Sequence, residues 1–436
     1  MVRLKKVNNI IIVALGAGVP NWYNELNTFL KQPELYNIFE YEGKPDKRHQ
    51  QALSCKQSGK VNILIMNYEK AHLDRKWLIK FKPDLLICDE SQSIKNRKAK
   101  VTKALSSVAN KCEYCYILTG TPISLGYEDI YGQFLVMNPT LLGTRWQDFE
   151  EKHLRMGGFM GHQVEGYRNL KSLKKIIHNN SFIVKKKDCL DLPKVTTQSL
   201  YCELSPKAKK AYKELDKELM AEFEGINYPT HVKTASQVLD YFKEGTDLIV
   251  LDNALTKAMK LQQITGGFIK NTETEQTMLI DKSKLNLLSD TVESCNLPLV
   301  IFCKFRAEMD MIREIFKQYK VAELSGKSKD DKGEPQKKGF INTQFQAGKY
   351  DILIVQIKTG SASINLTKAS TAIFYSWSSS YIDVAQAKAR LDRIGQISPV
   401  SIIFLISKGT VDEVSLQVLK RREEMSENLL KARSIY

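Results

Sequence analysis

The chain has 436 residues, of which 43% are hydrophobic and 26% are charged, a balance that is ordinary for a globular protein. This length exceeds what one ordinary hydrophobic core uses, so we expect two or three domains. The formal net charge of +16 favours a polyanionic partner, most simply nucleic acid, although a basic protein without such a partner would have the same composition.

Short apolar runs alternate with amphipathic, helix-like segments in two parts of the chain. In the first part we predict strands at Asn9–Ala14, Val61–Met66, Asp84–Cys88 and Tyr114–Leu118. In the second part we predict strands at Leu299–Phe302, Asp351–Val355, Thr371–Phe374 and Ser401–Leu405. Short apolar strands that alternate with helices are typical of parallel sheets covered on both faces, so the sequence predicts an α/β fold with two lobes.

The segment between these two parts has a different composition. Ser205–Glu224 carries apolar residues at helical spacing among lysines and glutamates, and it is followed by a polar patch at Gly225–Thr234. Ser205 and Pro206 form a favourable helix start, because Ser caps helices and Pro suits the first helical position. We therefore predict a first lobe at residues 1–144, a mostly helical insertion and linker at 145–285, and a second lobe at 286–436.

No segment predicts a membrane protein. The apolar runs, such as Ile10–Leu15, are too short to cross a bilayer, and no basic-then-apolar leader opens the chain. The 8 cysteines are scattered, which favours reduced thiols and a cytoplasmic location. Cys112 and Cys115 have zinc-like spacing but lack a second pair of ligands, so a reduced pair is favoured over a metal site.

Two carboxylates follow the apolar run Leu85–Cys88. Asp89 and Glu90 would then stand at the carboxyl end of a strand, where open α/β sheets bind ligands. Asp89 at this place can hold Mg²⁺ through water, and Glu90 can orient or deprotonate the water that attacks a γ-phosphate. An acidic turn after a buried strand would look the same, so the pair is a weak signal alone.

A second motif, Leu118-Thr-Gly-Thr-Pro122, also closes an apolar run. The hydroxyl groups of Thr119 and Thr121 flank Gly120, and Pro122 prevents the strand from continuing. Such a turn can contact the acidic pair and relay its state to the rest of the lobe. A plain strand-to-loop turn is the alternative.

A third motif runs from Gln386 to Gln396 and contains Arg390 and Arg393. The two arginines are three residues apart on a helix predicted to run from Tyr381, so they would share one face. Guanidinium groups offer a planar fork to phosphate oxygens and can stabilise charge on a transferring phosphoryl group. A solvated basic helix face is the alternative, which Gln386 and the Gly395-Gln396 pair make less favourable.

A phosphate-cradling loop of the form Gly-x-x-x-x-Gly-Lys-Ser/Thr does not occur in the 436 residues. Three stretches imitate part of it: Gly16-Ala-Gly18 lacks the lysine, while Ser58-Gly-Lys60 and Gly326-Lys-Ser328 lack the first glycine. Without that glycine the nest of backbone amides that binds a pyrophosphate is not specified.

Taken together, these motifs resemble the Snf-type (Swi/Snf-like) ATPases of helicase superfamily two, from about residue 10 to about residue 425. Pro20-Asn-Trp-Tyr-Asn-Glu-Leu26 is similar to the family's "N-W-x-x-E-L" helix, and Asp89-Glu-Ser-Gln92 stands at its Asp-Glu box. Thr359–Thr367 and Gln386–Gln396 are similar to two motifs of the family's second lobe.

The resemblance implies two RecA-like lobes that bind ATP and Mg²⁺ in the cleft between them and translocate along double-stranded DNA. It also implies site residues. The catalytic residues would be Asp89, Glu90, Arg390 and Arg393, with Asp89 holding Mg²⁺ through water. Nucleotide binding and coupling would involve Gln92, Thr119, Gly120, Thr121, Gly360, Asn365, Gln386 and Gln396.

The chain departs from the family pattern at three places. Ser361 and Ser363 replace glycines, and Gln92 replaces a histidine that couples the ATP and DNA sites. Family members also carry a strand and the phosphate loop before the first matching residue, whereas only Met1–Asn9 precede it here. We therefore expect an N-terminally incomplete first lobe with uncovered apolar neighbours, completed by a missing N-terminal segment or an upstream polypeptide.

Three functions remain open at this point. The first is a DNA-dependent ATPase, a minimal motor of bacterial or viral origin, whose phosphate loop lies outside the sequence. The second is a DNA-binding remnant or scaffold that does not hydrolyse ATP. The third is a helicase that separates the strands of DNA or RNA.

Overall fold

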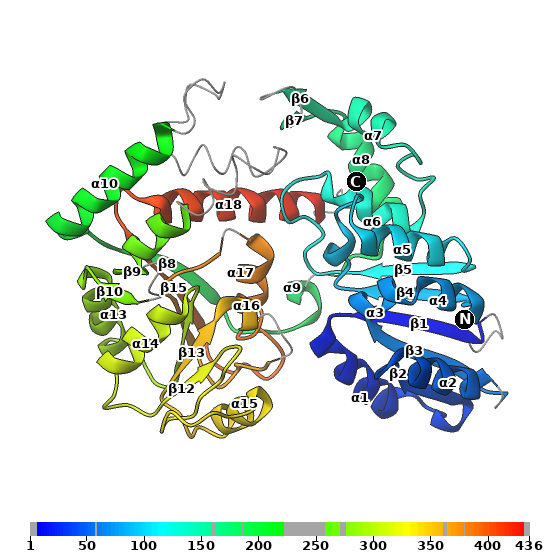
Figure 1. Ribbon diagram of the computed structural model, residues 1–436, viewed down its shortest axis with the longest axis horizontal. Helices are drawn as coiled ribbons and strands as arrows, with labels where there is room; N and C mark the ends of the chain where they lie inside the picture. The colour runs from blue at the N-terminus through cyan, green and yellow to red at the C-terminus, as the bar shows by residue number, and fades with distance from the viewer. Residues whose placement is uncertain are drawn as a thin grey trace. The chain divides into compact units, whose positions relative to one another are not determined.

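The computed structural model describes residues 7–56, 59–157, 163–184, 186–221, 258–270, 276–360, 364–378 and 380–430 (Figure 1). The chain divides into two compact units. Unit one comprises Met1–Arg155, Tyr167–Ser181 and Met425–Tyr436, and unit two comprises Met156–Gly166 and Phe182–Glu424. The predicted boundaries at residues 1–144, 145–285 and 286–436 stay a prediction. The polar patch expected at Gly225–Thr234 lies outside the described residues.

Unit one contains a five-stranded parallel sheet with the strand order β2-β3-β1-β4-β5. Its strands are β1 (Asn9–Ala14), β2 (Tyr36–Glu40), β3 (Val61–Asn67), β4 (Leu85–Asp89) and β5 (Tyr114–Leu118). All four strands predicted in this part are confirmed. β2 was not predicted, because the edge strand Tyr-Asn-Ile-Phe-Glu is only half-buried and has no continuous apolar run.

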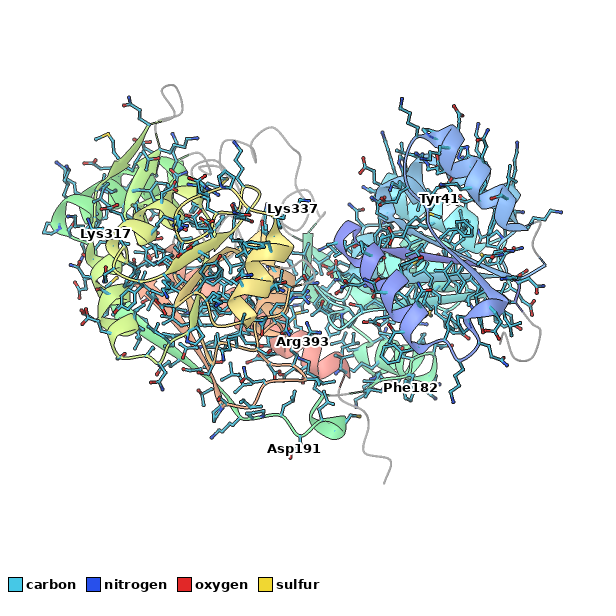
Figure 2. All side chains as sticks on the ribbon, turned by 90° about the horizontal axis from the view of Figure 1, so that it is seen from below. Tyr41, Phe182, Asp191, Lys317, Lys337 and Arg393 are labelled. Carbon is cyan, nitrogen blue, oxygen red and sulfur yellow. The ribbon has the colours of Figure 1, made fainter. Side chains whose placement is uncertain are left out.

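Helices cover the two faces of this sheet unequally. On one face Ile11, Leu64 and Leu86 pack against α2 to α5, whereas on the other face Ile12 and Ile65 pack against α1. Tyr41, labelled in Figure 2, is buried on the better covered face. The helices of unit one are α1 (Val19–Phe29), α2 (Pro45–Lys56), α3 (Tyr68–Leu73), α4 (Arg75–Phe81), α5 (Lys100–Ala109), α6 (Asp129–Met137), α7 (Trp146–His153) and α8 (Leu170–Asn179).

One edge of the first sheet is open. Within the described part of the chain, β5 pairs only with β4, so its other edge has no strand partner. Tyr116 and Leu118 on β5 are 45% and 41% exposed. An exposed apolar edge strand is a template for pairing with another strand.

Unit two contains a six-stranded parallel sheet with the strand order β12-β13-β11-β14-β15-β8. Its strands are β8 (Val195–Cys202), β11 (Leu299–Cys303), β12 (Val321–Leu324), β13 (Ile352–Gln356), β14 (Thr371–Phe374) and β15 (Val400–Ser407). The four strands predicted here are also confirmed. β8 lies in the segment expected to be mostly helical, and its largely exposed, polar sequence as an edge strand explains why no apolar run revealed it.

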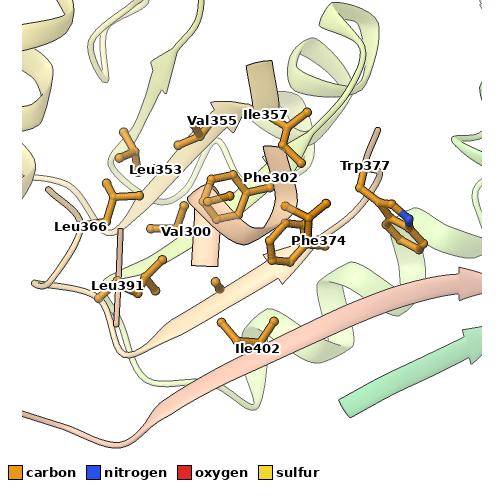
Figure 3. Close-up of a cluster of buried hydrophobic side chains, with 14 of the residues drawn as sticks. Val300, Phe302, Leu353, Val355, Ile357, Leu366, Phe374, Trp377, Leu391 and Ile402 are labelled. Carbon is orange, nitrogen blue, oxygen red and sulfur yellow. The ribbon is translucent and has the colours of Figure 1, made fainter. Parts of the chain in front are cut away.

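The core of unit two lies on both faces of this sheet. The rings of Phe302, Phe374 and Phe404 from β11, β14 and β15 stack with centroid distances of 4.8 and 4.7 Å on the face shown in Figure 3.

The helices of unit two are α9 (Lys186–Cys189), α10 (Pro206–Ala221), α13 (Ser283–Glu293), α14 (Arg306–Ile315), α15 (Lys338–Gln346), α16 (Ile357–Gly360), α17 (Tyr381–Lys388) and α18 (Val411–Leu430), whose last turns belong to unit one. The helix start predicted at Pro206 is confirmed.

Two further sheets of two strands each lie outside the parallel sheets. β9 (Phe268–Lys270) pairs with β10 (Thr277–Leu279), and β6 (Leu154–Gly157) pairs with β7 (Gln163–Tyr167). Among the described residues, none of the helices has the length and apolar character needed to span a membrane.

Candidate active site

Asp89 is the last residue of β4, at the carboxyl end of the parallel sheet of unit one. Its carboxylate accepts a hydrogen bond from the indole Nε1 of Trp22 at 2.9 Å and another from the backbone N–H of Glu90 at 2.9 Å. Its backbone carbonyl accepts a hydrogen bond from the Tyr68 hydroxyl at 2.5 Å. Burial holds the pKa of Tyr68 well above its usual range, so this hydroxyl stays protonated and donates. Asp89 is therefore fixed in orientation by groups from three segments.

Glu90 adopts a left-handed backbone conformation, with φ 50° and ψ 54°. A residue other than glycine in this region carries a strain of about 1 kcal/mol or more, and such strain is concentrated at functional sites. The Glu90 carboxylate accepts a hydrogen bond from the side-chain amide of Gln92 at 2.6 Å. This turn directs the side chain of Glu90 toward Gln92 rather than along the strand.

Gln92 joins the acidic pair to the turn after β5. Its amide oxygen accepts a hydrogen bond from the Thr119 hydroxyl at 2.7 Å, and the Thr119 oxygen in turn accepts one from the backbone N–H of Thr121 at 3.0 Å. A side chain added at Gly120 would meet nothing within 4 Å, so this turn is open on its outer side. The structure thus brings together the two motifs expected to touch, while their roles in catalysis stay a prediction.

A buried residue that the sequence did not single out supports this arrangement from behind. Gln133 on α6 accepts a hydrogen bond from Ser91 at 2.7 Å and donates one to the carbonyl of Pro122 at 2.7 Å. It therefore ties the acidic turn to the end of the Thr-Gly-Thr-Pro turn. No sequence motif points to Gln133. Trp22 does lie inside the Asn-Trp motif, but that motif does not indicate a hydrogen bond to Asp89.

The donor set of this site fits a hard cation only in part. Asp89 and Glu90 offer carboxylate oxygens, which Mg²⁺ prefers. No group of three or more His, Cys, Asp or Glu side chains that could hold a metal occurs in the described ranges, so water and phosphate oxygens would have to complete the coordination. Burial raises the pKa of each of the Cys112 and Cys115 thiols to about 12, and the reduced pair expected there stays a prediction.

The arginines of unit two are not on a helix, and that part of the prediction is wrong. α17 ends at Lys388, and Arg390 and Arg393 lie in the turns that follow it. After Lys388 the backbone forms turns, in which the N–H groups of Arg390 and Leu391 donate to the carbonyls of Ala387 and Lys388 at 3.2 and 3.1 Å. The carbonyl of Arg390 accepts a hydrogen bond from the backbone N–H of Leu366 at 3.0 Å. Arg393, labelled in Figure 2, is exposed.

Leu391 and Gln396 fix this arginine turn, which we define as residues 389–396. Leu391 is fully buried in the cluster of Figure 3. The Gln396 side chain is also buried and donates to the carbonyls of Ala369 and Leu391 at 2.9 and 3.3 Å. The amide group of Gln396 is thus used inside unit two, and its role in nucleotide binding stays a prediction.

A lysine from α9 also contacts the arginine turn. The Lys186 ammonium donates to the backbone carbonyl of Asp392 at 2.6 Å and lies 3.3 Å from its carboxylate. Phe182, four residues earlier, is the first residue after the chain re-enters unit two. No sequence pattern marks this contact, since Lys186 is one of three consecutive lysines.

The remaining predicted residues occupy separate places in unit two. Gln386 is half-buried on α17, and Gly360 is the last residue of α16. Asn365 accepts a hydrogen bond from the Thr367 backbone at 3.3 Å, and its carbonyl accepts one from Gln346 at 2.5 Å. Ser361 and Ser363 lie outside the described residues.

Comparison with known families decides the membership of this chain. Residues 2–266 match the family model of the SNF2-related domain, and residues 283–395 match that of the helicase conserved C-terminal domain. The chain belongs to the SNF2 family. The resemblance drawn from the motifs is confirmed, and SNF2 membership places the protein among helicase-related ATPases at the level of the superfamily.

Several SNF2 relatives align over nearly the whole chain. The "Uncharacterized ATP-dependent helicase MG018" of Mycoplasma genitalium is 26% identical over 430 residues, which cover 96% of this chain and 37% of that protein. The "TATA-binding protein-associated factor MOT1" of Saccharomyces cerevisiae is 24% identical over 92% of this chain and 23% of its own length. The "Chromodomain-helicase-DNA-binding protein 1-like" of Danio rerio is 23% identical over 94% of this chain and 38% of its own. The chain therefore spans less than half of the length of these relatives.

A solved structure gives a further similarity. The "Sulfolobus solfataricus SWI2/SNF2 ATPase core in complex with dsDNA" aligns with 98% of this chain and 84% of its own, at 22% identity and a TM-score of 0.39.

Proposed function

We propose that the chain is the motor region of an SNF2-type ATPase that uses ATP and Mg²⁺ to move along double-stranded DNA. The observation that carries this proposal is the hydrogen-bonded series Glu90, Gln92 and Thr119. It links the acidic residues that would sense the nucleotide to a turn that can report its state. A surface acidic turn with no function would not need a strained Glu90 and a buried Gln92.

Each site residue has a role in this proposal. Asp89 would hold Mg²⁺ through water, and Glu90 would orient the attacking water. Bound Mg²⁺ would neutralise charge on the phosphate oxygens. Arg390 and Arg393 would be delivered by unit two when the lobes close, and arginines in this role contribute about 10³–10⁵ in rate.

A phosphate loop is still required, and the open edge of β5 supports the idea that it comes from outside the 436 residues. We propose that a missing N-terminal segment or an upstream polypeptide adds a strand at this edge and carries the loop. The uncovered Tyr116 and Leu118 are suitable partners for such a strand, because its addition would remove them from water.

DNA binding is supported by a basic cavity on unit one, of about 590 Å³, near the N-termini of α4 and α5. It is lined by the cations Arg75, Lys76, Lys100 and Lys103, and by His49 and His72. The one acidic side chain in its lining, Asp74, is already paired with Arg48 at 2.6 Å. A cavity with this excess of positive charge suits the phosphate backbone, and the name of the zebrafish relative includes DNA binding.

The second candidate is a DNA-binding protein that does not hydrolyse ATP, which the lack of a phosphate loop in the sequence favours. The experiment that separates the two measures ATP turnover, with and without double-stranded DNA, by the chain expressed together with the codons upstream of Met1. DNA-stimulated turnover supports the motor. Salt-sensitive DNA binding without turnover supports the second candidate.

The basic cavity is tested separately by binding. In the Lys100→Ala/Lys103→Ala double variant, DNA affinity should fall for every sequence, and the dependence of log affinity on log salt should become shallower by about 2. Lys317→Ala, which removes a lysine paired with Glu314 in unit two, is the matched control and should leave that slope unchanged. An unchanged slope in the double variant would remove this cavity from the proposed DNA contact.

A further inference from the structure

Trp22 reaches the acidic site from α1, an element that does not itself belong to the acidic turn. It lies in the first turn of α1, 67 residues before Asp89, and its Nε1–H donates to the Asp89 Oδ2 at 2.9 Å. The body of the indole packs against the apolar cluster that contains Ile10, Ile12 and Val19. The ring is thus held by packing, while its polar edge is directed at the carboxylate.

The Asp89 carboxylate keeps acceptor capacity while Trp22 holds it. Each of its oxygens accepts one hydrogen bond, from Trp22 or from the Glu90 backbone. An ionised carboxylate has about four lone-pair sites, so each oxygen retains one for a water or a cation. The indole N–H is a donor only and cannot ligate a cation itself.

We infer that Trp22 is a positioning residue for the cation site: its N–H fixes the rotamer of Asp89 so that the free lone pairs face the divalent cation. This inference rests on the proposed function, which makes Asp89 the holder of Mg²⁺. Partners that orient a metal-holding side chain typically change metal affinity by about 10–100-fold when they are removed. A second consequence concerns fluorescence: a cation bound at Asp89 would lie beside the indole of Trp22, so a quenching cation should reduce the emission of that tryptophan.

The alternative is that the hydrogen bond only satisfies a partly buried indole N–H. Both readings predict a small loss of stability when Trp22 is replaced by Phe, because Phe keeps most of the packing and loses one hydrogen bond. Only the positioning role predicts a change in cation affinity. Stability alone therefore does not separate the two.

Mn²⁺ is a suitable probe because it replaces Mg²⁺ at oxygen sites and quenches the fluorescence of a nearby indole. The experiment titrates the full chain with Mn²⁺ alone and reads affinity from the paramagnetic resonance signal of the free ion, which does not depend on tryptophan. Variants are Trp22→Phe, Asp89→Asn and, as a matched control, Trp77→Phe, whose indole stacks on His49 at 4.9 Å.

We expect Trp22→Phe to weaken Mn²⁺ binding by about tenfold or more and to remove the quenchable part of the emission. Trp77→Phe should keep both the affinity and the quenching. If Trp22→Phe binds Mn²⁺ as tightly as the wild type while Asp89→Asn does not, the positioning role is overturned and the cation site stands.

If Asp89→Asn binds Mn²⁺ as the wild type does, the cation site itself is overturned and the role of Trp22 with it. Should Trp22→Phe fail to fold, the wild type and Asp89→Asn still test the cation site beside Trp22 on which the inference rests. Mn²⁺ should quench the wild-type emission and leave that of Asp89→Asn unquenched. Equal quenching in the two proteins would contradict the inference.

Discussion

The Thr119 hydroxyl donates a hydrogen bond to the amide oxygen of Gln92 over 2.7 Å, across the carboxyl ends of two adjacent strands. The amide nitrogen of the same Gln92 side chain donates a second hydrogen bond, to the carboxylate of Glu90. Because a glutamine amide has a donor and an acceptor on opposite sides of one planar group, a rotation at Gln92 changes both contacts together. The pair is therefore suited to couple the acidic site to the turn after β5.

Thr119→Val should uncouple these motifs. The variant keeps the shape of the side chain but removes the hydroxyl, so we expect DNA-stimulated ATP turnover to fall about fivefold, the equivalent of one hydrogen bond of about 1 kcal/mol. DNA affinity should be unchanged. Thr140→Val, at an exposed threonine whose hydroxyl donates to Asn138, is the control in both assays, and equal turnover by the two variants would argue against the coupling.

Arg393→Ala should reduce ATP turnover by about 10³-fold or more, because the exposed guanidinium would no longer reach the transferring phosphoryl group. DNA affinity should change by less than about twofold, since one phosphate contact at most would be lost. Arg421→Ala, an exposed arginine on α18, is the control. A parallel loss of turnover and of DNA binding would mean that Arg393 binds DNA or maintains the fold.

Lys186→Ala should loosen the arginine turn. The ammonium group of Lys186 holds the carbonyl of Asp392, so its removal should lower the hydrogen-exchange protection of residues 389–396 by about fivefold, or about 1 kcal/mol. Exchange is measured by mass spectrometry. Lys317→Ala breaks a pair of similar length with Glu314 and should not affect this turn. Unchanged protection in Lys186→Ala would show that Leu391 and Gln396 hold the turn by themselves.

Glu308 should make the stability of the protein depend on pH. This carboxylate is fully buried at the start of α14, and burial raises its pKa from 4.5 to about 7, against hydrogen bonds from Ser376 and the Phe305 backbone that lower it. Below pH 4.5 the group is protonated in both states. Between pH 4.5 and 7 the unfolded chain releases the proton and the folded chain keeps it, so stability falls as pH rises.

The Glu308→Gln variant is the comparison for this effect. It cannot ionise, so the difference in unfolding free energy between wild type and variant should change by at most about 3 kcal/mol from pH 4.5 to pH 7 and then level off. Urea unfolding at several pH values measures it. A difference that is constant over this interval would mean that Glu308 ionises normally inside the protein.

Most of the strands that the sequence predicts have side chains buried on both faces, whereas β5 was predicted from its apolar run although it is partly exposed. β11 and β13 consist almost entirely of buried aliphatic or aromatic residues, so their apolar runs are continuous. β2 and β8 are edge strands whose apolar residues are interrupted by polar ones, Thr196–Ser199 in β8 among them, so no continuous apolar run marks them. Their pairing depends on a neighbour far away in the chain, as between β8 and β15.

The acidic pair could be predicted from the sequence, whereas the side chains that hold it in place, Trp22 and Gln133, could not. Asp89 and Glu90 follow an apolar strand, and this local pattern is visible. Trp22 and Gln133 act from other elements through single hydrogen bonds, which no local pattern encodes. Arg390 and Arg393 were found by their motif but placed on a helix, because no local pattern shows that the helix ends at Lys388 and that the Arg390 carbonyl bonds to Leu366.

The most direct test of the central claim is DNA-stimulated ATP turnover by the wild type and by Glu90→Gln, each expressed with the codons upstream of Met1. Glutamine keeps the size of the side chain and can still accept the hydrogen bond from Gln92, but it cannot accept a proton from water. We predict that DNA stimulates turnover by the wild type and that Glu90→Gln loses it while binding DNA equally well. Equal turnover by the two proteins would contradict the assignment of this acidic strand end as the hydrolytic site.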